Sequence, residues 1–273
     1  MSAIILDLAL ARRIEFAEAQ AAVDGAELLK ATRPDGGAAV EKIAGGFSVF
    51  CGVNSPTTQA VGIGLDGPVT PEEIDHMESF YFSRRDSTRV ELCPLADPSV
   101  VVEFGKRGYR VTEFSNVLVR PLDNPDPPAP SATALSIYTV PRTQVSEWAN
   151  LVAQGFAEHF PVTPELLEVM EMFAAGPHTT CFLARVDGQP AGGACISCRD
   201  GIAGLFGAST LPAFRNRGIQ TALLRIRLAL ARELGCELTA SIALPGSISH
   251  RNIQRQGFSV LYTRVKFEKE LPA

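Results

Sequence analysis

The chain of 273 residues lacks the features by which membrane and nucleic-acid-binding proteins are recognised. No apolar run approaches the ~18 residues that a membrane-spanning helix needs, so we expect no membrane partner. The formal net charge is −5, which gives no reason to expect binding to nucleic acid. The amino-terminal stretch has Asp7 among its apolar residues and no basic segment before it. We therefore expect no signal peptide and a cytoplasmic protein.

Six cysteines are scattered through the chain, and their distribution does not resemble the disulfide framework of a small secreted protein. Cys195 and Cys198 have the spacing of a CxxC motif, but they lie in "AGGACISCRDG", which has the pattern of a strand ending in an Asp-Gly turn. Redox pairs open a helix instead. With no second CxxC and no nearby pair of histidines, we expect structural thiols and no metal site. Hydrophobic residues make up 46% of the sequence, enough for an ample core.

A proline-rich segment divides the chain near its middle. "PLDNPDPPAP", residues 121–130, holds five prolines, and "SATA" follows it. Proline at this density stops helices and central strands, so residues 121–132 are predicted to be an extended linker. The predicted domains on its two sides are residues 1–120 and 133–273.

The two halves have related patterns. "VELCPLADPSVVVEFGKRGYRVTEF" and "TASIALPGSISHRNIQRQGFSVLYT" both predict strand, turn, short helix and strand. Gly108 and Tyr109 match Gly257 and Phe258 at an offset of 149 residues. Identity is low, so the repeat rests on order and spacing. We infer a duplication of one α/β unit.

The second half combines helices with antiparallel strands. "VSEWANLVAQGFAEHF" and "PELLEVMEMFAAG" have helical spacing, and three strands follow, joined by the turns Asp187-Gly188 and Asp200-Gly201. A helix from about residue 217 to 234 comes next, before another strand, helix and strand. This order predicts a mixed α/β sheet.

Arginines crowd the start of that long helix. Residues 212–234 contain five arginines and one acid, Glu233. The amino terminus of a helix binds anions, Gly218 allows a ligand close to the backbone, and Arg215 and Arg217 carry donors suited to phosphate. The pattern favours a polyphosphate ligand. The alternative is a solvated turn followed by ordinary core leucines. The turn has neither the GxxxxGK[ST] nor the GxGxxG pattern.

The segment "GASTLPAFRNRGIQTALL" resembles the acetyl-CoA-binding motif of the GCN5-related N-acetyltransferases (GNAT), with the pattern Arg/Gln-x-x-Gly-x-Gly/Ala at a helix start. "SISHRNIQRQGFSVLYTRVKFEKEL" resembles that family's last helix and final strand. The resemblance covers about residues 133–270, and the first half resembles a degenerate copy. It implies an α/β (α+β) fold with two tandem GNAT-like units, each a mixed, mostly antiparallel sheet flanked by helices.

The resemblance also implies roles for individual residues. The end of a splayed strand would hydrogen-bond the pantetheine arm, and the basic turn would wrap the pyrophosphate of acetyl-CoA. A residue of the later helix would contact the cofactor as well. The residues at these positions are Ala208, Ser209, Thr210, Arg215, Asn216, Arg217, Gly218, Ile219, Gln220, Thr221 and Asn252.

Three departures from the family's pattern concern the chemistry. Gln220 stands where Gly or Ala is usual, Ile253 where the family often has a tyrosine acid, and Gly246 where asparagine is usual. The strand "IAGLFGAST" has no carboxylate to act as base. The candidate bases are Glu158 and His159, in the loop "GFAEHFPVTPE". His250 and Tyr262 are lesser candidates, and each of the four has a structural role as its alternative.

The first half has "GLDGPVTPEEIDHM" where the phosphate loop should be, and its acidic residues would repel a pyrophosphate. We expect that half to bind no cofactor. The predicted function is an N-acetyltransferase that moves an acetyl group from acetyl-CoA to a primary amine of a small molecule or peptide, in a monomer or homodimer. One alternative is an inactive acyl-CoA-binding sensor or scaffold. Another is a transferase of a different acyl group, or one that acts on a thiol-sugar amine.

Overall fold

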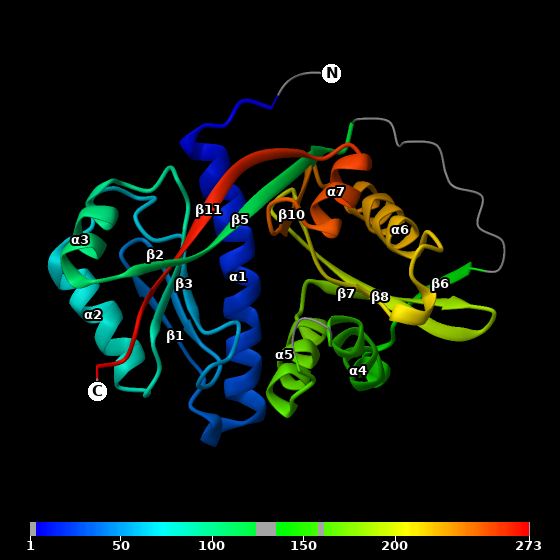
Figure 1. The fold of residues 1–273 in the computed structure, drawn as a ribbon, viewed down its shortest axis with the longest axis horizontal. Helices are drawn as coiled ribbons and strands as arrows, with labels where there is room; N and C mark the ends of the chain where they lie inside the picture. The colour runs from blue at the N-terminus through cyan, green and yellow to red at the C-terminus, as the bar shows by residue number, and fades with distance from the viewer. Residues whose placement is uncertain (1–3, 124–134, 158–160, 273) are drawn as a thin grey trace. The chain divides into compact units, whose positions relative to one another are not determined.

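Residues 4–123, 135–157 and 161–272 are described by the computed structural model (Figure 1). By their internal contacts they divide into two units. The N-terminal unit comprises Ser2–Val117, Ala243–Pro245 and Val260–Ala273. The C-terminal unit comprises Leu118–Ile242 and Gly246–Ser259.

The N-terminal unit has a sheet with helices packed on it. In the sheet, hydrogen-bonded neighbours follow the order β1-β2-β3-β4-β11-β5. The pairs β1–β2, β2–β3 and β4–β11 are antiparallel, and the pair β3–β4 is parallel. Its elements are α1 (Leu8–Thr32), the 3-10 turn Pro34–Gly36, β1 (Ala39–Ile43), β2 (Gly46–Phe50), β3 (Gln59–Val61), α2 (Pro71–Phe82), β4 (Thr88–Leu92), α3 (Ser99–Arg107), β5 (Arg110–Pro121) and β11 (Ser259–Lys269).

Two helices of this unit are fixed by side-chain caps. Asp7 accepts a hydrogen bond from Leu10 N–H at the start of α1. Thr70 and Glu73 form a complete capping box at the start of α2, with Pro71 in its first turn. The core beneath α2 and α3 contains Ile74, Met77, Tyr81, Val90, Val100 and Phe104.

The C-terminal unit is a second α/β arrangement. The order of its strands is β10-β9-β8-β7-β6, with the end of β5 beside β10. β9 and β10 are parallel, and the pairs β6–β7, β7–β8 and β8–β9 are antiparallel. Its elements are β6 (Leu135–Thr139), the 3-10 turn Arg142–Gln144, α4 (Val145–Phe156), α5 (Pro164–Ala175), β7 (Thr179–Val186), β8 (Gln189–Arg199), β9 (Ile202–Thr210), the 3-10 turn Pro212–Phe214, α6 (Ile219–Glu233), β10 (Leu238–Ala243) and α7 (Ile248–Arg255).

Two adjacent glycines of β8 show which helix covers which face of this sheet. A β-carbon on Gly193 would meet the indole of Trp148 on α4, whereas one on Gly192 would meet Ile219 on α6. Neighbouring residues of a strand point to opposite faces. Helix α4 therefore covers one face and α6 the other, and α5 packs against α4 and β7. The mixed, mostly antiparallel sheet with flanking helices confirms the predicted fold class.

The predicted turns and the long helix are also confirmed. Asp187 and Gly188 have φ values of +50° and +78°, and Asp200 and Gly201 have +49° and +76°, as a type I′ hairpin turn requires. The helix expected at about 217–234 is α6.

The repeat appears in the order of elements, since β3-α2-β4-α3-β5 parallels β9-α6-β10-α7-β11. The contact-based units nevertheless cross the boundary expected from the linker. The residues of β5 from Leu118 group with the C-terminal unit, and those of β11 from Val260 group with the N-terminal unit. Residues 124–132 of the predicted linker lie outside the described residues, and the domain limits stay a prediction.

Candidate functional site

Strand β9 changes its pairing half-way along. Its parallel register with β10 ends where Leu205 lies opposite Ser241. Beyond that point β9 advances three residues while β8 advances two, and Gly207 takes a φ of +58°, which marks a β-bulge. No register with β10 is present for the described residues from Phe206 onward. The peptide groups on that side of the bulged segment, which includes Ala208, Ser209 and Thr210, can therefore hydrogen-bond an extended ligand.

Helix α6 begins close after this segment and has an open amino terminus. Gly218 is its N-cap residue at φ +74°, and no side chain caps the first turn. Asn216 also has a positive φ, +62°, so two of three consecutive residues turn the chain into the helix in the left-handed region. The side chain of Ile219 is buried in the core, which leaves only its backbone N–H for a ligand. Together with Gln220 and Thr221, this turn presents N–H groups and the positive end of the helix dipole.

Arg215 and Arg217 are exposed beside this turn, but both already have contacts within the chain. Arg215 Nε lies 3.4 Å from the carbonyl oxygen of Thr210, and its Nη2 lies 3.5 Å from that of Gly155. The guanidinium of Arg217 lies 5.5 Å from the ring centroid of Phe214. Arg215 thus links the end of β9 to the end of α4, a role that the sequence pattern did not indicate.

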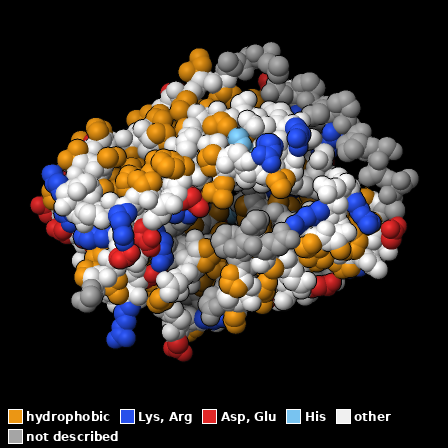
Figure 2. Space-filling model, viewed as in Figure 1, with side chains coloured by type: hydrophobic (Ala, Val, Ile, Leu, Met, Phe, Trp, Pro, Cys, Tyr) orange, Lys and Arg blue, Asp and Glu red, His pale blue; other side chains and the backbone are white. Residues whose placement is uncertain are grey.

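Gln220 points toward α7. Its Oε1 accepts a hydrogen bond of 2.5 Å from Asn252 Nδ2, and Asn252 Oδ1 accepts one of 2.9 Å from Arg255. This chain of bonds joins the first turn of α6 to α7 and explains how the site accommodates a residue larger than Gly or Ala. Figure 2 shows Lys and Arg side chains gathered over the region of α6 and α7. Arg251 and Arg255 are exposed there.

The side chain of Ser209 holds β9 against α4. Its Oγ donates a 2.9 Å hydrogen bond to the carbonyl of Val152. A β-carbon on Gly155 would lie 2.6 Å from that of Ser209, so this glycine is required for the approach of the helix. Sequence reasoning missed Gly155, Gly192 and Gly207. The available signals were the two adjacent glycines of "AGGA" and the single glycine inside the helical pattern "AQGF" and inside the strand pattern "LFGAS".

The candidate bases fall into two groups. Glu158 and His159 lie outside the described residues. His250 accepts a 3.2 Å hydrogen bond from Gly246 N–H through Nδ1 and so stabilises the turn into α7. Tyr262 belongs to the N-terminal unit, where its hydroxyl donates a 2.7 Å bond to Glu15, and burial next to that carboxylate raises the tyrosine's pKa. Tyr262 is therefore part of a buried structural cluster.

Comparison with known proteins identifies this region. Residues 144–258 match the model of the Acetyltransferase (GNAT) family. They form a GNAT domain. Among curated proteins no significant match to the chain is found.

Several solved structures have the same fold as this chain and match most of its length. A GCN5-related N-acetyltransferase from Kribbella flavida matches with a TM-score of 0.64 and 17% identity, over 93% of this chain and 96% of the other. A tandem GNAT protein from the clavulanic acid biosynthesis pathway matches with a TM-score of 0.56 and 16% identity, over 84% and 79%. A conserved protein of unknown function from Staphylococcus epidermidis matches with a TM-score of 0.57 and 13% identity, over 89% and 97%. At these identities the likeness shows the fold.

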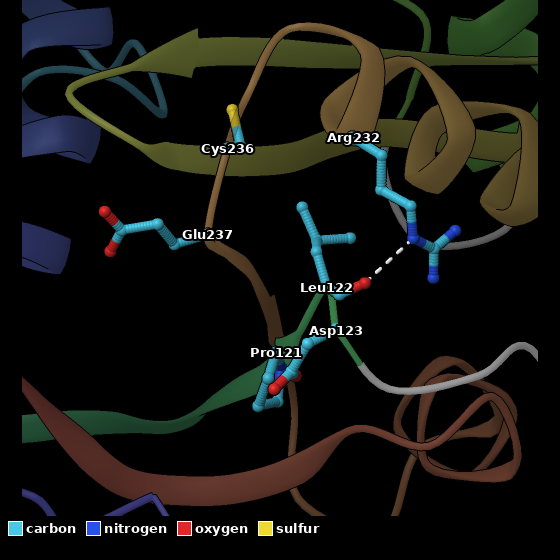
Figure 3. A pocket seen from close by; sticks show the side chains of 6 residues that line it. All are labelled: Pro121, Leu122, Asp123, Arg232, Cys236 and Glu237. Atoms are coloured by element: carbon cyan, nitrogen blue, oxygen red, sulfur yellow. Dashed lines mark hydrogen bonds between the residues drawn. The ribbon is translucent and has the colours of Figure 1, made fainter.

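A surface pocket of about 430 Å³ lies in another part of the C-terminal unit (Figure 3). It is lined by Arg232 in the last turn of α6, by Leu122 and by Glu237, with Arg232 Nε donating a 2.9 Å bond to the Leu122 carbonyl. This is the carbonyl end of the helix, where the dipole opposes an anion. The pocket is therefore not the site expected for a pyrophosphate.

The GNAT domain and the N-terminal unit differ at the start of the matching helix. The first turn of α2 is capped by Thr70 and Glu73, whereas that of α6 is open.

In the described part of the chain there is no cluster of residues that could hold a metal ion. No helix in the described ranges has the length and apolarity to cross a membrane.

Proposed function

We propose that the GNAT domain binds acetyl-CoA and transfers its acetyl group to a primary amine of a small molecule or peptide. The observation that carries the proposal is the open amino terminus of α6, which follows the end of β9 that pairs with β8 and has no register with β10, within the matched family segment. The helix terminus suits a pyrophosphate, and the strand suits an extended chain with amide groups. Acetyl-CoA contains both, because its pyrophosphate is linked to the pantetheine arm.

In this proposal the backbone of Ala208–Thr210 hydrogen-bonds the pantetheine arm and the thioester carbonyl. The N–H groups of Gly218–Thr221 surround the pyrophosphate, with Asn216 shaping the turn. The side chains of Arg215 and Arg217 contribute positive charge. Asn252 acts through its hydrogen bond to Gln220, which holds α7 against the phosphate-binding turn.

The reaction needs a neutral amine close to the thioester carbonyl. The amine nitrogen attacks the carbonyl carbon, the carbon–sulfur bond breaks, and the thiolate of CoA takes up a proton. Positioning and backbone N–H groups that stabilise the oxyanion supply much of the rate. Because Tyr262 is bound to Glu15, we assign the proton transfers to water, with Glu158 and His159 as proposed bases.

A second candidate is an acyl-CoA-binding protein without transferase activity. This candidate is favoured by the composition of β9, because Ile202–Thr210 contains no ionisable side chain that could act as a base. A bound acyl-CoA with no turnover for any amine would support this candidate.

The test is calorimetric titration of acetyl-CoA, followed by an assay of CoA release with a panel of amines. We expect one site per chain and micromolar affinity. Arg217→Ala should weaken binding, whereas Arg142→Ala should not, because Arg142 donates to the carbonyls of Ala175 and Gly176 at the end of α5. Two sites per chain would show that the capped N-terminal unit also binds cofactor. No binding to the folded protein would refute the proposal.

A further inference from the structure

Two aromatic side chains stand on one face of the sheet beside the bulge. Phe206 lies opposite Cys195 in the β8–β9 register, and Cys195 shares its face of β8 with Gly193, which faces Trp148. Phe206 is therefore on the face covered by α4 and α5. Its ring packs against Phe173 of α5, with the ring centroids 5.3 Å apart and the planes tilted by 54°.

These rings are only partly covered, although β9 is an internal strand. Ile202, Ala203 and Leu205 of β9 are buried, whereas Phe206, Gly207 and Ala208 are half-buried. An internal strand of a sheet with helices on both faces is expected to be covered along its length. Phe206 is the first half-buried side chain of β9 and stands where β9 leaves β10, so it adjoins the proposed thioester position.

Helix α5 continues the apolar wall. Leu166, Met170 and Phe173 follow the i, i+4, i+7 spacing of one helix face, and all three are half-buried. Glu168 and Glu171 stand on the opposite side of the helix at this spacing. Because Phe173 contacts Phe206, the apolar face points toward the bulge and the two glutamates point away from it.

The side chains around Phe173 and Phe206 carry no charge, and this restricts the kind of amine that can bind there. Besides Met170 and Phe206, the half-buried residues packed against the core around Trp148 are Tyr138, Val145, Phe156 and Leu211, and none of them is charged. Polyamines and aminoglycosides need carboxylates to bind their additional ammonium groups, and carboxylate-bearing amines need cations. The apolar face of α5 and the side chains of Ile202–Thr210 provide neither, and the nearby Arg215 already lies at the carbonyls of Thr210 and Gly155.

We propose that the acceptor is a primary amine with an aromatic or bulky apolar body, which packs on Phe173 and Phe206 while its nitrogen reaches the thioester carbonyl beside Ala208. This inference rests on the proposed acetyl transfer and specifies its substrate class. The amine gives up one proton to water or a base, and the departing thiolate of CoA gains one.

The experiment measures CoA release with four acceptors of graded chemistry: 2-phenylethylamine, butylamine, putrescine and a peptide with an acidic amino-terminal residue. We expect kcat/KM for 2-phenylethylamine to exceed that for putrescine by at least about tenfold, from the burial of one aromatic ring. Phe173→Ala should lower kcat/KM for 2-phenylethylamine about tenfold, mainly through KM, and should change the value for butylamine by less than about twofold.

Two further variants keep the result interpretable. Phe173→Leu retains apolar volume, so it should fold and show an intermediate loss. Glu171→Ala, on the opposite face of α5, should leave all four acceptors unchanged. The affinity for acetyl-CoA reports both folding and the proposed function, and it should be unchanged in every variant. Preference for putrescine or for the acidic peptide, with intact acetyl-CoA binding, would overturn the acceptor inference alone. If the folded wild-type protein does not bind acetyl-CoA, the proposed function itself is overturned.

Discussion

Gly155 at the end of α4 lies against Ser209 of β9 so closely that a β-carbon at position 155 would be 2.6 Å from the β-carbon of Ser209. Ser209 itself donates a hydrogen bond to the carbonyl of Val152, one turn earlier in the same helix. The bulged end of β9 is therefore fixed to α4 by a close contact and a buried hydrogen bond. This rigid attachment holds the peptide groups that we assign to the pantetheine arm.

The contact predicts that Gly155→Ala destabilises the protein. The added methyl group cannot be accommodated without moving Ser209 or the helix, and we expect a loss of about 1–3 kcal/mol in the free energy of unfolding. Gly105→Ala in α3 is the matched control, because no atom lies within 4 Å of its added β-carbon. That variant should gain up to ~1 kcal/mol from helix propensity. Urea unfolding of both variants gives the comparison, and equal effects would contradict the packing argument.

The second prediction concerns the phosphate-binding turn. Gly218→Asp places a carboxylate where the open turn of α6 faces the proposed pyrophosphate, and we expect the Kd for acetyl-CoA to rise at least about tenfold, or about 1.4 kcal/mol. Gly235→Asp is the control at the other end of the helix. Gly235 has a φ of +72° against +74° for Gly218, and neither glycine has a neighbour within 4 Å of an added β-carbon. The two variants share the same backbone strain, so an equal change in Kd would place the anion elsewhere.

Much of the fold could be predicted from local sequence signals. The Asp-Gly turns fixed the β7–β8 and β8–β9 hairpins, because both residues must adopt a positive φ. The bounds of α6 followed from its leucine spacing and from Gly218. The element order of the two halves followed from their shared pattern.

Other features depend on tertiary contacts that sequence spacing does not encode. The grouping of β11 with the N-terminal unit arises from its pairing with β4 and from the buried Arg264, which reaches Glu15 on α1. The alignment of "GFSV" with "GYRV" gives no sign of it. The direction of Gln220 likewise depends on Asn252, a residue 32 positions away. The cofactor residues themselves stay a prediction.

The third prediction is that Cys93, Cys195 and Cys198 react slowly in the native protein. Cys195 and Cys198 do not behave as a redox pair, because Cys195 is fully buried and lies opposite Cys181 in the β7–β8 register. Burial raises the pKa of Cys198 to about 12, and burial also raises that of Cys93 to about 12. At pH 8 such thiols hold about 10³ times less thiolate than an ordinary cysteine, so their reaction with an aromatic disulfide reagent should be slower by a similar factor.

The measurement is the release of the coloured thiolate with native and with guanidinium-unfolded protein. The unfolded chain should release six equivalents rapidly, in accord with its six cysteines. A fast native phase that disappears in Cys198→Ser would show that this thiol is reactive and would contradict the prediction.

The fourth prediction is a loss of stability at high pH that arises from buried tyrosines of the N-terminal unit. Burial is the largest cause of a raised pKa at Tyr81, Tyr109 and Tyr262, and the carboxylate of Glu15 raises that of Tyr262 further. A raised folded pKa means that the folded state keeps its proton where the unfolded state has lost it. These groups therefore stabilise the fold fully below the unfolded pKa of about 10, and this contribution is lost as the pH rises above it.

Comparison of the wild type with Tyr262→Phe isolates one of these groups. Above pH 10 each buried tyrosine lowers the free energy of unfolding by up to about 1.4 kcal/mol per pH unit, and buried thiols act with the same sign. The slope of Tyr262→Phe should therefore be shallower by up to that amount, since Glu15 keeps its 2.7 Å bond to Arg264 in this variant. Urea unfolding at pH 9, 10 and 11, with tyrosinate absorbance recorded in parallel, gives both quantities. Equal slopes of the free energy of unfolding against pH would contradict the prediction. The hydroxyl of Tyr262 would then lose its proton at the same pH in the folded and unfolded chains, which would mean that water reaches Tyr262 and Glu15 in the folded protein.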